Sequence, residues 1–170
     1  FALLGLVLCF GEGDLIHGSN ESYRFCDGRI IADFGELFRP SLKAKTLEPL
    51  TSLQELYWLS LGTFMVEQDG LLPLAKLRKL KYLFISNKYK FEDVAALAGA
   101  RPDLECDLFE PVSGVYDFFA CKKCGEHTMI LPVGKGKPWM CQVCDAKKIE
   151  KHINQFNKIA NDHLKWSSKR

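Results

Sequence analysis

The fold is decided by the segment Leu50-Thr-Ser-Leu53-Gln-Glu-Leu56-Tyr-Trp-Leu59-Ser-Leu61. Its leucines follow one another at steps of 3, 3, 3 and 2, and residues 74–85 repeat those steps 24 residues later, with Ile in the last place. Steps of 3 suit a turn that climbs like a 3₁₀ helix, and the closing Leu-x-Leu alternation suits a short strand. The sequence therefore predicts a repeated turn and strand unit.

Weaker copies of this unit flank the strong pair. Residues 6–8 and 30–32 are short apolar runs that are again 24 positions apart. Residues 91–98 predict a helix with acidic residues in its first turn, ended by Gly99 and Pro102, and residues 104–106 predict a last strand. The total is about five units, more than the roughly three that a repeat array needs for stability.

This pattern resembles that of leucine-rich repeat proteins, most strongly over residues 50–85. The resemblance implies an α/β solenoid over residues 1–118, with a short parallel sheet and a helical or irregular convex side. The asparagine of that family would fall on Phe64 and Lys88, whereas Asn87 is one place early. We therefore expect an irregular array, and because the chain begins with Phe rather than Met we expect it to be processed or part of a longer protein.

Two cysteine pairs predict a metal site in the last third of the chain. Cys121-Lys-Lys-Cys124 is followed after 16 residues by Cys141-Gln-Val-Cys144, and this spacing suits one tetrahedral ion held by four thiolates. The apolar segments between the pairs predict a hairpin. The arrangement resembles a zinc ribbon over residues 119–145, which implies one structural Zn²⁺. The alternatives are a redox pair, which lacks its βαβ context, and His127 replacing one cysteine ligand.

The charge changes sign along the chain. Residues 1–118 carry 12 basic and 17 acidic side chains and residues 119–170 carry 11 and 4, so the net charge of +2 combines −5 with +7. Residues 146–170 predict a basic amphipathic helix that starts after Asp145 and packs on the ribbon or on the last repeat. Its apolar stripe consists of Ile149, Ile153, Phe156, Ala160 and Leu164.

Two surfaces are candidates for binding. The residues between the strand leucines would face the concave side of the array, and large aromatic residues there are typical of protein-binding anchors. The alternative is that another part of the chain covers them. This first candidate surface consists of Trp58, Ser60, Tyr82, Phe84 and Ser86. The second carries lysines suited to phosphate groups, with a solvated turn as its alternative. It consists of Lys122, Lys123, Lys135 and Lys137.

No local motif indicates catalysis, so we expect a non-enzymatic intracellular scaffold for a protein partner, with nucleic-acid binding as the alternative. No small-molecule substrate is expected, and no run of about 18 apolar residues indicates a membrane span. The resemblance to bacterial leucine-rich repeat proteins whose last repeat runs into a zinc ribbon implies the same scaffold role. Four of the seven cysteines are assigned to metal, and we expect Cys9, Cys26 and Cys106 to be buried thiols. A reducing, cytoplasmic compartment follows from these assignments.

Overall fold

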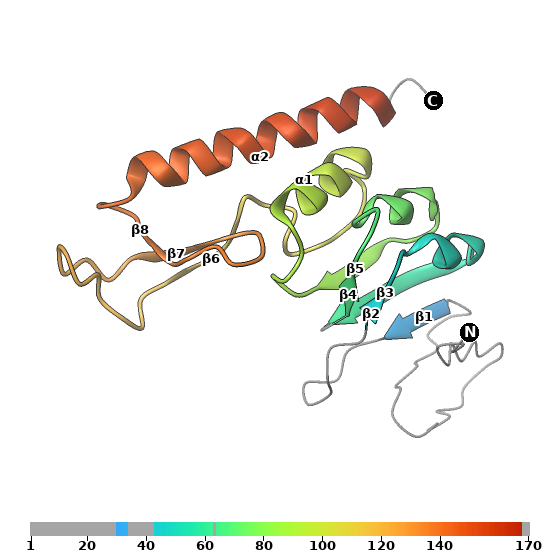
Figure 1. Cartoon of the computed structure of the whole chain (residues 1–170), viewed down its shortest axis with the longest axis horizontal. Coiled ribbons are helices and arrows are strands. Elements are labelled where there is room, and N and C mark those ends of the chain that lie inside the picture. Colours follow the sequence, from blue (N-terminus) through green and yellow to red (C-terminus); the bar gives the residue numbers. More distant parts are fainter. Residues whose placement is uncertain (1–29, 34–42, 63, 168–170) are drawn as a thin grey trace.

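The computed structural model describes residues 30–33, 43–62 and 64–167 (Figure 1). This part of the chain is a mixed α/β fold with three small sheets and two α-helices, as the sequence predicts in outline. The predicted strand at residues 6–8, together with Cys9 and Cys26, lies outside the described residues. The elements are β1 (Ile30–Asp33), β2 (Lys43–Ala44), η1 (Glu48–Ser52), β3 (Leu56–Gly62), β4 (Met65–Val66), η2 (Leu72–Lys76), β5 (Tyr82–Ile85), α1 (Phe91–Ala100), β6 (Val112–Tyr116), β7 (Met129–Pro132), β8 (Met140–Cys141) and α2 (Ala146–Ser167).

A parallel sheet of order β1-β3-β5 forms one face of the molecule. Trp58 lies opposite Tyr82 and Leu59 opposite Leu83, so these partners in β3 and β5 are 24 residues apart, the period of the leucine pattern. The predicted strand at residues 104–106 is reduced to one parallel bridge between Glu105 and Tyr82. A second pair of strands, β2 and β4, is also parallel.

The period of three in the sequence comes from repeated backbone hydrogen bonds. The N–H of Leu53 donates to the carbonyl of Leu50, and that of Leu56 to the carbonyl of Leu53, both at 3.0 Å. The same two bonds recur 24 residues later, before β5. Because each bond spans three residues, every third side chain returns to the same side of the chain and enters the core. The two strong units predicted at residues 50–61 and 74–85 are therefore confirmed as a turn followed by a strand.

The core lies between the parallel sheet and the helices. Leucines of β3, η2 and β5 fill it, with Leu50 of η1 packed against its edge, and Leu56, Leu59 and Leu61 have no exposed surface. Burial of each such side chain contributes about 1.5 to 3 kcal/mol. Val133 from the β7–β8 turn and Phe156 from α2 belong to the same cluster. The three predicted regions of the chain therefore share one core.

Helix α1 runs through Gly99 to Ala100 and ends directly before the second predicted stop residue, Pro102, with Arg101 as its C-cap. A Cβ atom at Gly99 would overlap the carbonyl oxygen of Ala160 and lie 2.6 Å from its carbonyl carbon. The glycine therefore allows a close crossing of α1 and α2 and does not act as a helix stop. After the helix, the buried guanidinium of Arg101 donates to the carbonyls of Leu77 and Leu80.

Helix α2 is confirmed and packs on α1, the helix of the last repeat (Figure 1). The rings of Phe91 and Phe156 are 6.2 Å apart. The predicted apolar stripe is wrong at Leu164, whose side chain is 44% exposed. Each residue turns the helix by about 100°, so Leu164, eight residues after the buried Phe156, points about 80° away from it around the helix axis. Instead His152 is buried on this face, with its Nε2 atom 2.9 Å from the carbonyl oxygen of Pro111. Within the described residues, no helix combines the length and the apolar composition needed to cross a membrane.

The cysteine-rich region forms an antiparallel sheet of order β6-β7-β8. The predicted hairpin between the cysteine pairs is confirmed as β7 and β8. Strand β6 is not predicted by the sequence, because Ser113 and Gly114 interrupt the apolar alternation of its five residues. Strand β6 lies within residues 1–118 but pairs with β7, so the antiparallel sheet begins before the predicted boundary at residue 119.

Candidate metal centre and binding surfaces

Four cysteines from two turns meet at one end of the antiparallel sheet, and their Sγ atoms all lie within 4.8 Å of one another. Cys121 and Cys144 are 3.9 Å apart, and Cys124 and Cys141 are 3.6 Å apart, measured between Sγ atoms. A tetrahedral ion with metal–sulfur bonds of about 2.3 Å requires sulfur atoms about 3.8 Å apart. The four sulfurs therefore lie close enough together to hold one metal ion.

Backbone hydrogen bonds shape both turns. The N–H of Gly125 donates to the carbonyl of Cys121 at 2.9 Å, and the N–H of Asp145 donates to the carbonyl of Cys141 at 3.0 Å. Gly125 has a φ of 75°, a conformation that glycine adopts without strain. The carboxylate of Asp145 accepts a bond from the N–H of Cys141 and so links the second turn to the start of α2.

The electrostatics of the cluster favour a bound cation. The backbone amides of Lys123 and Cys124 hold the pKa of the Cys121 thiol at about 7, which favours the thiolate that metals bind. The neighbouring sulfurs, Cys124 first, raise the pKa of Cys144 to about 12. The four sulfurs cannot all ionise beside one another unless a cation balances their charge. His127 is exposed and is not part of the cluster.

The other end of the sheet is docked on the repeats. The amide of Asn87 donates to the carbonyl of Pro132 at 3.1 Å, and its oxygen accepts from the N–H of Gly134 at 2.6 Å. The N–H of Lys135 donates to the carbonyl of Tyr89 at 2.7 Å. Asn87, one place early for the family's asparagine, therefore joins the repeats to the cysteine-rich sheet.

The four lysines predicted for phosphate contact lie at two separate places. Lys122 and Lys123 are exposed in the first cysteine turn, before β7. Lys135 and Lys137 lie in the β7–β8 turn, at the opposite end of the sheet and beside α1 (Figure 1). The ammonium of Lys137 lies 4.9 Å from the ring centroid of Phe91. The described part of the chain therefore shows no single surface made by these four side chains.

The predicted concave residues do lie in rows across the parallel sheet. Trp58 is opposite Tyr82, and Ser60 is opposite Phe84. Phe84 is 53% exposed, Trp58 and Tyr82 are half-buried, and Ser60 is buried. Ser86 is half-buried, and its Oγ has no hydrogen-bond partner among the described residues. The face thus presents aromatic side chains to solvent, with Phe84 the most exposed.

The sequence does not predict an aromatic cluster on the cysteine-rich sheet. The ring of Trp139 contacts three others edge to face, with centroid distances of 4.8 Å to Tyr116, 5.7 Å to Phe118 and 5.3 Å to Phe119. Phe118 is 66% exposed. The run of aromatic residues just before Cys121 is the feature of the sequence that could have predicted this cluster, since such a run outside a predicted core indicates aromatic side chains on the surface.

Comparison with known proteins gives no name for this arrangement. No family model, curated protein or solved structure matches the chain. The resemblance to leucine-rich repeats and to zinc ribbons therefore remains an inference from the residues themselves. The functional argument rests on the geometry of the cysteine cluster and of the exposed aromatic side chains.

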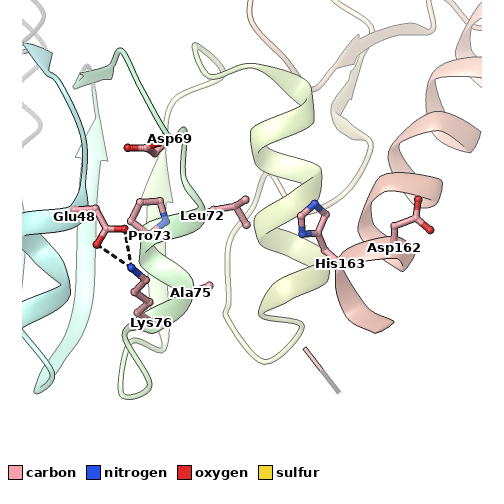
Figure 2. Close-up of a pocket in the computed structure, with 8 residues that line it drawn as sticks. All are labelled: Glu48, Asp69, Leu72, Pro73, Ala75, Lys76, Asp162 and His163. Carbon is pink, nitrogen blue, oxygen red and sulfur yellow. Dashed lines mark hydrogen bonds and ion pairs between the residues drawn. The ribbon is translucent and has the colours of Figure 1, made fainter. Parts of the chain in front are cut away.

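A pocket of about 570 Å³ lies between the turns of the repeats and the end of α2 (Figure 2). Its floor is largely apolar and includes Leu72 and Pro73. The carboxylate of Glu48 is bound by the ammonium of Lys76 at 2.7 Å. In Figure 2 Asp162 points away from the other polar side chains. The polar groups therefore do not converge on one position as catalytic groups would.

Proposed function

We propose that this chain is a non-enzymatic leucine-rich repeat module that binds a protein partner on the concave face of its parallel sheet. The observation that carries the proposal is Phe84, an aromatic side chain 53% exposed on a strand whose opposite face is packed in the core. Trp58 and Tyr82 lie beside it on the same face. Aromatic residues grouped in this way supply much of the binding energy in protein interfaces.

The cysteine cluster is proposed to hold one structural Zn²⁺ in a zinc ribbon. Four sulfur donors at tetrahedral spacing fit zinc and leave no coordination place for water or substrate, so the ion supports the fold. Such an ion would hold the two cysteine turns together next to the start of α2, at the end of the sheet away from the repeats. Four thiols kept for a metal imply a reducing compartment, and we propose the cytoplasm.

The ribbon and α2 are proposed to close the end of the repeat array. The last unit of an array exposes apolar residues unless an atypical segment covers them. Here Val133 is fully buried in the common core, and Phe156 packs against Phe91 at the start of α1. This role leaves the concave face free for a partner.

The concave face is tested by capture from a lysate of the native host, comparing the unchanged chain with Phe84→Ala. The matched control is Leu164→Ala, because Leu164 is also an exposed apolar side chain but lies on α2. A protein retained by the unchanged chain and the control but lost with Phe84→Ala supports the proposal. Equal retention by all three rejects the concave face as the binding site.

The same capture tests the nucleic-acid alternative. Lysine contacts to phosphates weaken steeply between about 50 mM and 200 mM salt, whereas an aromatic protein contact does not. Nuclease treatment that removes the captured material, together with a steep salt dependence, would favour nucleic acid. Loss of retention after Lys122→Ala but not after Phe84→Ala would support the same conclusion.

The metal is tested separately by elemental analysis of the purified chain. We expect one zinc per chain, and we expect Cys121→Ser to lose it. Cys106→Ser is the matched control, because burial raises the pKa of the Cys106 thiol to about 11 and this cysteine is outside the cluster. A chain without zinc, or a Cys121→Ser variant that keeps it, would contradict the proposed site.

A further inference from the structure

Strand β6 is an outer strand of the β6-β7-β8 sheet, and its sequence Val-Ser-Gly-Val-Tyr contains no charged residue. Outer strands usually carry charges, are very short or are covered, because their free backbone groups otherwise pair with another chain. The other outer strands among the described residues follow this rule. Strand β1 contains Asp33, β5 is bordered by Glu105, and β8 has two residues.

The surface beside β6 is apolar as well. Val115 is 62% exposed on the strand, and Phe118 is 66% exposed just after it. Phe118 packs against Tyr116, with ring centroids 5.3 Å apart, so the two rings form one surface continuous with the strand. Because successive residues of a strand point to opposite faces, Val115 lies on one face of β6, and Tyr116 with Phe118 on the other. We call Val115, Tyr116 and Phe118, which together flank the strand on its two faces, the β6 patch. An exposed apolar patch next to an unprotected outer strand indicates an interface.

We propose that β6 pairs antiparallel with β6 of a second copy of this chain, about a twofold axis at Val115. The two three-stranded sheets then form one continuous sheet. A twofold axis places the same surface on both sides of the interface, so the surface must be complementary to itself. An uncharged strand with an apolar patch meets this requirement.

The register about Val115 brings compatible residues together. Val115 lies opposite its own copy, a pair of β-branched side chains that stabilises neighbouring strands. Gly114 of each copy lies opposite Tyr116 of the other, and because each Tyr116 ring covers Gly114 of its own chain, the two rings would lie side by side across the axis. Asp117, the nearest charge, falls opposite Ser113, so like charges do not meet. A charged partner would have no complement on β6 itself, and for this reason we commit to a second copy.

This interface is independent of the proposed partner site. Phe84 lies on the parallel sheet, and β6 belongs to the other sheet. A failure of one proposal therefore leaves the other in place, and each has its own variants.

The test is the mass of the purified, zinc-loaded chain in sedimentation or light scattering, from about 1 to 500 µM. The unchanged chain should rise from 19.3 kDa towards twice that mass as its concentration increases. Val115→Lys should stay at the single-chain mass throughout. Leu164→Lys is the matched control, since it places the same charge on an exposed apolar position of α2, and it should behave like the unchanged chain. Circular dichroism verifies that both variants are folded.

Amide hydrogen exchange locates the interface. Exchange at residues 112–116 should slow with increasing concentration in the unchanged chain and in Leu164→Lys, but not in Val115→Lys. A chain that remains at 19.3 kDa at every concentration overturns the proposal. So does a dimer that persists in Val115→Lys or that protects residues other than those of β6.

Discussion

Replacing Gly99 by alanine should destabilise the protein, although the same change in an exposed helix would stabilise it. Alanine favours an α-helix over glycine by about 1 kcal/mol. At this position, however, the new Cβ would lie 2.6 Å from the carbonyl carbon of Ala160, and that neighbour is backbone that cannot rotate away. The sign of the effect therefore reports the contact between α1 and α2.

The magnitude follows from the displacement that the new methyl group requires. An ordinary contact begins at about 3.4 Å, and the carbonyl oxygen of Ala160 lies closer than its carbonyl carbon, so the two helices must separate by more than about 1 Å where they cross. Overpacking of this kind costs about 1 to 3 kcal/mol, and the gain in helix propensity offsets part of it. We expect a net loss of about 1 to 2 kcal/mol, and more for Gly99→Val. For a chain of this size that corresponds to a melting temperature about 2 to 8 °C lower.

The assay is thermal and urea unfolding by circular dichroism at a fixed excess of zinc, because bound metal itself shifts apparent stability. Ala98→Gly, at the neighbouring position of α1, measures helix propensity without adding a contact and should lose about 1 kcal/mol. A Gly99→Ala variant as stable as the unchanged chain, or more stable, would refute the close crossing of the helices.

Three further substitutions address the contacts that hold the ends of the repeats. Asn87→Ala leaves the N–H of Gly134 and the carbonyl of Pro132 unpaired, and it should lower the free energy of unfolding in urea by about 1 to 3 kcal/mol. An unchanged urea midpoint would show that these two bonds do not contribute to stability. Arg101→Met keeps the apolar stem but loses two bonds to buried carbonyls, so we expect a loss of about 2 to 3 kcal/mol in the same assay. Burial lowers the pKa of His152 below its ordinary value of 6.5, so the folded chain binds fewer protons than the unfolded chain and should lose stability as the pH falls below that value. His152→Gln should remove this part of the pH dependence, and an identical pH profile would contradict the assignment.

The repeated units and the cysteine site could be predicted because each follows from spacing within a short segment. The leucine steps correspond to hydrogen bonds three residues apart, and the two cysteine pairs need only a turn each to bring their sulfurs together. In both cases local geometry determines which side chains meet. A single sequence contains that information.

The contacts between segments could not be predicted in this way. Of the two predicted stop residues Pro102 follows the end of α1, whereas Gly99 lies inside the helix, and only the crossing of α2 explains its place there. His152 is not part of the predicted apolar stripe, yet it is buried where the helix faces Pro111. The pairing of β6 with β7 joins residues about 15 positions apart across the first cysteine turn, and nothing local to β6 specifies it.

The proposed cap on the repeats also restricts how the length of this protein can change. Helix α2 crosses α1 without room for a side chain at Gly99, and the ribbon turn is bonded to Asn87, so a unit added after β5 would have to reproduce both contacts. A 24-residue unit inserted before η2 would need only leucines at the same positions as its neighbours in order to pack between them. We therefore expect that evolution or design can duplicate a repeat before η2, whereas a repeat added after β5 would lose the contacts of Gly99 and Asn87.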